Sequence, residues 1–488
     1  MPIFTEEALE LLATPLSIRL ERAAETRDRA ELAWIQAQLD LECLAIYDPY
    51  IQWAGVLQTF LLDRLGRRGH DEALLWAAEH AFRPFVRELG GLGVRVRVEG
   101  LAGRLRASGS TFWVEEDEAR VRFRLESWGG AARQWLPPAE RRRADGRYHY
   151  ERHGSYEAPA SFAWLEGAGP LTQGRDRLPC FFATEILFLE IQAIELNGFP
   201  IAVVTLPDAP DAPAFLDVFK DAAEIPEEAY ARVGTAKPKT GLPRERGRLF
   251  TDDELERLGV PLSLQVEAAA GAGDWERLHA LTAGMDAELV SAKDPLGILI
   301  AGLLTWIARH LGEDAAEAAL ERTAEVVMSP FVDAVRDLHI ADAIPLWAMV
   351  WRAHGSTYWI EEHEETFVLR GRPLGACARM WSHAYQPRVE RISDSRVRYP
   401  TFGCYDAPAS FHLMREPRGI THMKTGYPVY STHCHMLHEL FPIDQLGHPL
   451  WVELHPLHDR DAETVHVHYK DPAAWPERYY QMVGREKR

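Results

Sequence analysis

The chain has 488 residues, of which 54 are Lys or Arg and 73 are Asp or Glu, and its formal charge is −19. With 47% hydrophobic and 26% charged residues, it has the composition of a globular protein and the length of two or three domains. The acidic balance excludes a general role in binding nucleic acid or anionic membranes, because those partners are themselves negatively charged.

The cysteine count and the apolar runs point to a cytoplasmic protein. Five widely spaced cysteines are an odd number and do not form a disulfide framework. The first residues lack the cationic start and apolar stretch of a signal peptide. The longest apolar run, residues 296–308, is shorter than the roughly 20 residues that cross a membrane, so we expect a buried core helix there.

The chain contains an internal repeat. Asp48-Pro49 recurs 246 residues later as Asp294-Pro295, and each pair is typical of a helix start. Residues 110–135 match residues 356–381 without a gap, with 11 of 26 positions identical. Further matches join GSYEAPASF (154–162) to GCYDAPASF (403–411), and residues 179–200 to 428–449. Collinear blocks at a nearly constant offset predict a tandem duplication of a unit of about 200 residues.

The repeat predicts three segments. The first repeat covers residues 1–234, a linker with a short helix covers 235–267, and the second repeat covers 268–488. Each repeat begins with helices, and the stretches FWVEEDEARVRFRL and YWIEEHEETFVL then alternate in the manner of strands. Helices first and strands later favour an α+β fold with a mainly antiparallel sheet in each repeat.

The two repeats differ most in histidine. Residues 1–310 contain 6 histidines and residues 311–488 contain 14. Many of the later ones replace an apolar residue of the first repeat: His435 stands against Ile186, and His438 against Leu189. We therefore expect the first repeat to be structural and the second to be the functional unit.

One short segment concentrates this difference. Residues 433–439 contain His433, Cys434, His435, His438 and Glu439. On an α-helix, Cys434 and His438 would share one face, and so would His435 and Glu439. Imidazole and thiolate are natural ligands of zinc and iron, so the segment predicts a mononuclear metal site.

A strand near the carboxyl terminus offers further ligands. His466 and His468 alternate in VHVHY and would project from one face, where the first repeat has Leu216 and Val218. We expect Glu439 to act as the acid/base or to orient a ligand, with Cys434 as a second catalytic candidate. The candidate metal ligands are His433, Cys434, His435, His438, His466 and His468.

Other interpretations of the same residues stay open. The histidines could form a hydrogen-bonded core or a solvated helix face without metal, or Cys434 could be a thiol nucleophile activated by a neighbouring histidine. The sequence lacks a GxxxxGK[ST] phosphate loop, a GxSxG elbow and a GxGxxG fingerprint after a strand. No nucleotide cofactor is therefore indicated.

The functional expectation is an enzyme that acts on a small-molecule substrate through one metal ion. With zinc the reaction would be hydrolytic or lyase-like, and with iron it would be an oxidation by an oxygenase. The alternative is a non-catalytic small-molecule-binding protein or a structural metal protein. We also expect pseudo-twofold packing of the two repeats, as in a homodimer of an undivided form.

Overall fold

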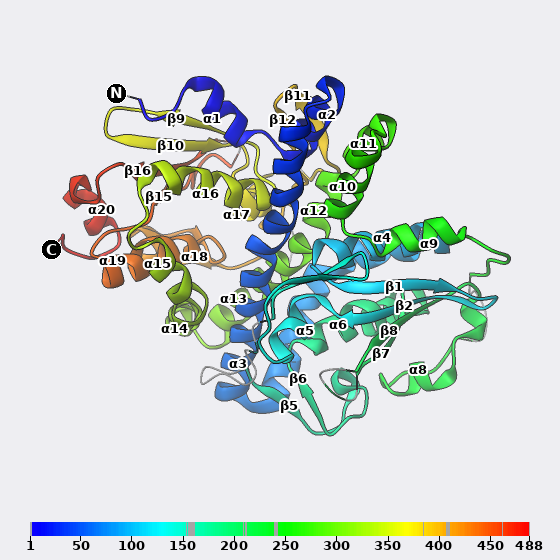
Figure 1. Ribbon diagram of the computed structural model, residues 1–488. Coiled ribbons are helices and arrows are strands. Elements are labelled where there is room, and N and C mark those ends of the chain that lie inside the picture. The colour runs from blue at the N-terminus through cyan, green and yellow to red at the C-terminus, as the bar shows by residue number, and fades with distance from the viewer. Residues whose placement is uncertain are drawn as a thin grey trace. The chain divides into compact units, whose positions relative to one another are not determined.

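The computed structural model describes residues 2–152, 154, 162–207, 209, 212–238, 243–383, 385–406, 410–460 and 462–487 (Figure 1). These residues form helices and small antiparallel sheets, which confirms the predicted α+β class. Most of the predicted repeat block 154–162, and residues 407–409 of its counterpart, lie outside the described residues.

The chain divides into two compact units. We call Gln36–Asp274 with Ser291–Leu299 the central unit, and Met1–Ile35 with Trp275–Val290 and Ile300–Arg488 the terminal unit. The boundaries predicted for the sequence repeats stay a prediction, since a repeat in a sequence need not coincide with a compact unit.

The central unit contains a four-stranded antiparallel sheet in the order β1-β2-β8-β7. The alternating stretch that predicted strands forms β1 and β2, and every second residue of β2 from Val121 onward is buried. The strands are β1 (Thr111–Glu116), β2 (Arg120–Ser127), β7 (Val203–Thr205) and β8 (Ala214–Phe219). Two short hairpins pair β3 (Arg142–Ala144) with β4 (Arg147–His149) and β5 (Trp164–Glu166) with β6 (Arg177–Pro179).

Helices precede and follow this sheet. The long helix α3 (Arg29–Gly90) begins in the terminal unit, and its regular geometry breaks at Gly66, whose φ of 67° favours glycine. The other helices are α4 (Val94–Ala107), α5 (Gly129–Trp135), α6 (Phe182–Ile186), α7 (Gln192–Asn197), α8 (Glu227–Ala231), α9 (Asp252–Leu258) and α10 (Leu262–Ala272). A π-helical turn, η2 (Leu187–Ile191), joins α6 to α7, and short 3-10 turns lie at η1 (Pro170–Thr172) and η3 (Ala222–Glu224).

The terminal unit contains a second four-stranded antiparallel sheet, in the order β15-β16-β10-β9. Read in the opposite direction, as β9-β10-β16-β15, this order corresponds strand by strand to that of the central sheet. The strands are β9 (Tyr358–Glu362), β10 (Thr366–Gly371), β15 (Val452–Leu454) and β16 (Thr464–Tyr469). Two hairpins pair β11 (Glu390–Ser393) with β12 (Arg396–Arg398) and β13 (Leu413–Met414) with β14 (Tyr427–Pro428).

The helices of the terminal unit come from three stretches of the chain. They are α1 (Glu6–Ala13), α2 (Leu16–Thr26), α11 (Trp275–Thr282), α12 (Met285–Ser291), α13 (Lys293–His310), α14 (Glu313–Thr323), α15 (Ser329–Val335), α16 (Ile340–Ala353), α17 (Gly375–Trp381), α18 (Thr432–His435), α19 (Phe441–Leu446) and α20 (Glu477–Met482). Helix α13 also contains residues of the central unit. π-Helical turns lie at η4 (Ala324–Met328) and η6 (Met436–Leu440), and 3-10 turns at η5 (Gly419–Thr421) and η7 (Pro472–Ala474).

Among the described residues, one helical stretch is long and apolar enough to cross a membrane. It is Met285–His310, and 94% of its most apolar window is buried inside the protein. The predicted core helix at residues 296–308 lies within this stretch.

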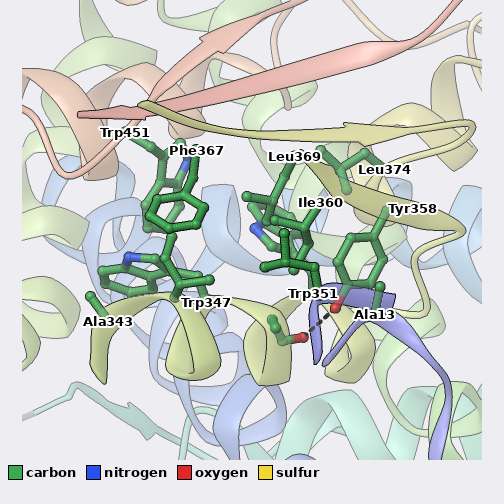
Figure 2. Close-up of a cluster of buried hydrophobic side chains, with 13 residues drawn as sticks. Ala13, Ala343, Trp347, Trp351, Tyr358, Ile360, Phe367, Leu369, Leu374 and Trp451 are labelled. Carbon is green, nitrogen blue, oxygen red and sulfur yellow. Dashed lines mark hydrogen bonds between the residues drawn. The ribbon is translucent and has the colours of Figure 1, made fainter. Parts of the chain in front are cut away.

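The core of the terminal unit lies between α16 and the sheet. Trp347 and Trp351 are four residues apart on α16 and therefore face the same side, toward Phe367 and Leu369 of β10 (Figure 2). The rings of Trp347 and Trp451 are 4.9 Å apart between centroids. This packing fixes the position of residue 451, which directly precedes β15.

Replacing Trp347 by Ala is expected to lower the free energy of unfolding by about 3–5 kcal/mol, because a large buried ring leaves a cavity. Urea titration followed by circular dichroism measures the change. The matched control is Tyr385→Ala, whose side chain is 64% exposed and should change stability by less than about 0.5 kcal/mol. Equal effects of the two changes would contradict this view of the core.

Candidate metal centre

The predicted site segment is helical but not uniformly α-helical. It consists of α18 followed by the π-turn η6, so a continuous α-helix through residues 433–439 is wrong, although His435 and Glu439 lie on one face as expected. A π-turn bonds residues five apart and shifts the later side chains around the helix axis. The ring of His438 instead stacks on Trp451, with 3.9 Å between centroids.

Three ligand atoms converge at the start of this segment. The sulfur of Cys377, on α17, lies 3.7 Å from the sulfur of Cys434 and 3.9 Å from Nε2 of His433. The sulfur of Cys434 lies 3.5 Å from the same Nε2. Tetrahedral zinc ligands at the usual bond lengths of about 2.0–2.3 Å would lie about 3.5–3.8 Å apart. The triangle therefore has the size of one face of a tetrahedral zinc site. We call these three residues the sulfur cluster.

The backbone fixes which nitrogen of His433 faces the sulfurs. Nδ1 lies 2.5 Å from the carbonyl oxygen of Tyr430, so that nitrogen carries the proton and donates it. The lone pair of Nε2 is then directed at the two thiols. Metal-bound histidines are commonly held in this way by a partner on the other ring nitrogen.

The thiols and the imidazole of the sulfur cluster shift each other's pKa. Burial opposes ionisation of Cys377, but hydrogen bonding with Cys434 and the adjacent His433 lower its pKa to about 6. Burial also opposes charge on His433, yet Cys377 and the Tyr430 carbonyl raise the pKa of the imidazole. Burial and the neighbouring Cys377 raise the pKa of Cys434. The cluster thus favours a thiolate at Cys377, the form that binds metals.

A buried carboxylate lies beside this cluster. Glu453, on β15, is 2% exposed, and its Oε2 lies 3.2 Å from Nε2 of His466. Burial alone would raise the pKa of Glu453, but the hydrogen bond and charge of His466 hold it well below its usual range. The carboxyl also contributes to raising the pKa of Cys434. Its Oε1 has no hydrogen-bond partner among the described residues.

A second group of ligand atoms involves the other end of the segment. Nε2 of His422 lies 2.7 Å from Oε2 of Glu439, and Nε2 of His435 lies 3.9 Å from Oε1. The two imidazole rings stack with 3.5 Å between centroids. We call His422, His435 and Glu439 the histidine–carboxyl cluster; its three ligand atoms lie within 4.8 Å of one another.

The histidine–carboxyl cluster is satisfied by hydrogen bonds. His435 contacts the Ile420 carbonyl through Nδ1 at 2.9 Å and the Tyr427 hydroxyl through Nε2 at 3.0 Å. Burial lowers the pKa of His422 and of His435 to about 3 and raises the pKa of Glu439 to about 8. All three groups are therefore neutral near pH 7, and the Glu439 hydroxyl donates to His422.

The central unit contains the same arrangement without histidine. Glu190, on η2, accepts from the Val204 amide at 2.7 Å and from the Gln173 side chain at 2.8 Å. Glu439 likewise accepts from the Glu453 amide at 3.0 Å. In each unit a buried carboxyl thus connects a π-turn to the strand that follows it, which is a structural role.

The predicted ligands are distributed over several environments. His433 and Cys434 belong to the sulfur cluster, whereas His435 and Glu439 belong to the histidine–carboxyl cluster. His466 holds Glu453, and His468 packs in the core with ring centroids 5.6 Å from Trp451 and 6.2 Å from Trp347. The predicted set of six therefore does not form one ligand shell.

Three residues of these clusters were not among the predicted ligands: Cys377, whose contrast with Ala131 is visible in the repeat, His422 and Glu453. Each stands where the first repeat has a residue of another type, namely Ala131, Gln173 and Val204. The contrast between Glu453 and the buried Val204 was the clearest available signal. No family model matches the sequence, and no curated protein or solved structure matches it.

Replacing His422 by Gln is expected to make the terminal unit more resistant to acid. The pKa of His422 is depressed in the folded state, so its stabilisation is complete above about pH 6.5 and is lost as the pH falls toward 3. The loss amounts to roughly 1.4 kcal/mol for each pH unit between the two pKa values. Gln, the residue at the matching position 173, does not titrate.

Acid unfolding followed by circular dichroism should show a midpoint at lower pH in His422→Gln than in the unchanged protein. The control is His383→Gln, whose side chain is 59% exposed and should leave the midpoint in place. An unchanged midpoint in His422→Gln would contradict the neutral, buried state of this imidazole.

Proposed function

We propose that the protein is a zinc-dependent enzyme that acts on a small molecule, with Cys377, His433 and Cys434 as the metal ligands. The observation that carries this proposal is the triangle of ligand atoms with edges of 3.5, 3.7 and 3.9 Å. Two cysteines and one histidine form a known catalytic zinc set, in which the fourth position is kept for water or substrate.

The donor chemistry favours zinc over iron. Thiolate is a soft ligand and imidazole a borderline one, and a tetrahedral set of sulfur and nitrogen donors is typical of zinc. We therefore propose a hydrolytic or lyase reaction rather than an oxidation. When bound, zinc would polarise a carbonyl group or lower the pKa of a water molecule toward 7.

Glu453 is the residue that we assign to proton transfer. Its ionised carboxylate is held through Oε2 by His466, while Oε1 is free of hydrogen bonds among the described residues. Its low pKa keeps the carboxylate ionised and able to accept the proton of a bound water, and makes the protonated form a strong acid that passes the proton on to a leaving group. Glu439 was the expected acid/base, but its contacts with His422 and the Glu453 amide favour a structural role.

A thiol enzyme is the second candidate. Cys377 has a pKa lowered to about 6 and lies 3.9 Å from Nε2 of His433, whose own pKa is raised. A thiolate beside an imidazolium is the arrangement of cysteine nucleophiles. This candidate uses the same residues without a metal ion, so metal analysis separates the two.

We also propose that the chain is a tandem duplication whose second copy carries the function. The equal strand order of the two sheets and the paired carboxyls Glu190 and Glu439 support this history. In the first copy, Ala131, Thr184 and Glu185 replace the three metal ligands. We propose a cytoplasmic location, since reduced thiols are the form that binds zinc.

The protein purified without chelator or histidine tag should contain about one zinc ion per chain, and Cys377→Ala should contain almost none, because two ligands hold zinc poorly. Metal is measured by elemental analysis after dialysis. The control is Cys404→Ala, a cysteine of the same unit outside both clusters.

Absence of metal from the unchanged protein, with Cys377 alkylated rapidly near pH 7, would instead support the thiol enzyme. Iron in place of zinc would contradict the hydrolytic reaction.

In Glu453→Gln we expect zinc to be retained, with metal affinity weakened by roughly 10–100-fold at most, and hydrolysis to fall on the order of 100-fold or more. The visible spectrum of the cobalt-loaded protein reports the ligand set. A spectrum equal to that of the unchanged protein fits an acid/base role, whereas a changed spectrum would make Glu453 a fourth ligand and the site structural.

A further inference from the structure

A helical segment near the amino terminus has a close counterpart in the middle of the chain. Residues 3–28 (IFTEEALELLATPLSIRLERAAETRD) match residues 249–274 (LFTDDELERLGVPLSLQVEAAAGAGD) without a gap, with 12 of 26 positions identical. The offset is 246, as in the other repeated blocks. Each segment forms two helices, α1 with α2 and α9 with α10, that begin after Thr5 or Thr251 and after Pro15 or Pro261. We call these segments the first and second arms.

The first arm docks on the sheet of the terminal unit. The amides of Ile3 and Phe4 donate to the two oxygens of Glu362 at 2.6 and 2.9 Å, at the end of β9. Lys470 pairs with the same carboxylate at 2.7 Å, and Arg352 donates to the carbonyl of Leu12. Helix α1 lies beside β9 (Figure 1).

The second arm docks on the sheet of the central unit with the same contacts. The amides of Leu249 and Phe250 donate to the two oxygens of Glu116 at 2.7 and 2.9 Å. Lys220 pairs with this carboxylate at 2.6 Å, and Arg106 donates to the carbonyl of Leu258 at 2.6 Å. Helix α9 packs against β1.

The second helix of each arm is also held by matching hydrogen bonds. Ser17 donates to Asp286 at 2.5 Å, and Tyr399 donates to the same carboxyl at 3.1 Å. In the central unit, Ser263 and Tyr150 donate to Asp40 at 2.9 and 3.4 Å. These contacts of one arm thus have counterparts in the other, and each arm adds contacts of its own, such as Arg22 with the Asp394 carbonyl and Arg95 with Glu254.

The arms are placed opposite to their order in the sequence. The first arm belongs to the first repeat but contacts β9 and α16 of the second repeat. The second arm precedes the helices of the second repeat but contacts β1 and α4 of the first. Given the tandem duplication proposed above, we propose that the two arms are copies of one docking segment, exchanged between the repeats, and that each docking site accepts either arm.

The chemistry of the docking site defines its ligand. A buried carboxylate accepts two consecutive backbone amides, a lysine neutralises it, and the helix that follows begins with acidic residues after a threonine cap. The matching segment is a short peptide of the pattern [IL]-F-T-[DE]-[DE]-x-L, present twice in this chain. Interchangeability follows because the matched contacts are made by the backbone amides and carbonyls and by the shared Phe and Leu, whereas the ion pair of Glu254 with Arg95 is particular to the second arm.

Hydrogen exchange of the full-length protein, followed by mass spectrometry, tests the docking sites. In Glu362→Gln we expect the amides of residues 3–13 to exchange at least tenfold faster, while those of residues 249–258 are unchanged. Glu116→Gln should give the reverse result. If both arms exchanged faster in each variant, or if neither did, the proposal of two separate, matched docking sites would be overturned.

Replacement of residues 3–14 by residues 249–260 tests interchangeability. We expect the replaced arm to remain protected within about threefold of the original, whereas a scrambled segment of the same composition should lose protection. A replaced arm that exchanges as fast as the scrambled one would overturn the proposal. Hydrogen exchange of the arms does not depend on zinc content. A result that contradicts the docking proposal can therefore be distinguished from one that contradicts the proposed metal site.

Discussion

The buried carboxyl of Glu439 is the contact on which the arrangement around the candidate site depends. A carboxyl group that is 0% exposed must make hydrogen bonds, because an unpaired polar group in the interior is costly. Glu439 meets this need through the amide of Glu453 and the imidazole of His422. It thereby ties the π-turn that follows Cys434 to the strand that carries Glu453.

The polar interior of the terminal unit follows from this tie. With β15 held against the helical segment, the Glu453 carboxylate lies beside the sulfur cluster and is paired with His466. The central unit keeps the tie through Glu190 but uses Arg232 and Gln173 as partners. The two units therefore share a scaffold, and the terminal unit differs by the groups that it places around the scaffold. This contrast separates the carboxyl that both units share, Glu190 or Glu439, from Glu453, which only the terminal unit has.

Much of the fold could be predicted from the sequence because it depends on local patterns. Alternation of apolar and charged residues predicted β1 with β2 and β9 with β10, and VHVHY predicted β16. The π-turn at residues 436–440 could not be predicted, since no residue type marks the extra residue of a π-turn. The division of the expected ligands between two clusters already begins in α18, where His433 and Cys434 join one cluster and the neighbouring His435 joins the other.

Only part of the candidate site could be predicted from the sequence, because its residues lie far apart along the chain. Cys377 lies 56 residues from His433 in the sequence, and nothing local connects the two. The sequence predicted a linker with a short helix at residues 235–267, a range that contains most of the second arm. The match between the two arms is present in the sequence, whereas the sheet on which each arm docks is set by tertiary contacts.

The docking of the first arm has a consequence for synthesis of the chain. Ile3 and its acceptor Glu362 are 359 residues apart, which corresponds to about 20–70 s of translation at typical rates. The second arm follows its own acceptor, Glu116, by 133 residues, so the central unit can close while the ribosome is still extending the chain. The first arm is made well before β9, so it cannot reach Glu362 until that strand has emerged. Docking of the first arm on Glu362 is therefore a late step in the folding of the terminal unit.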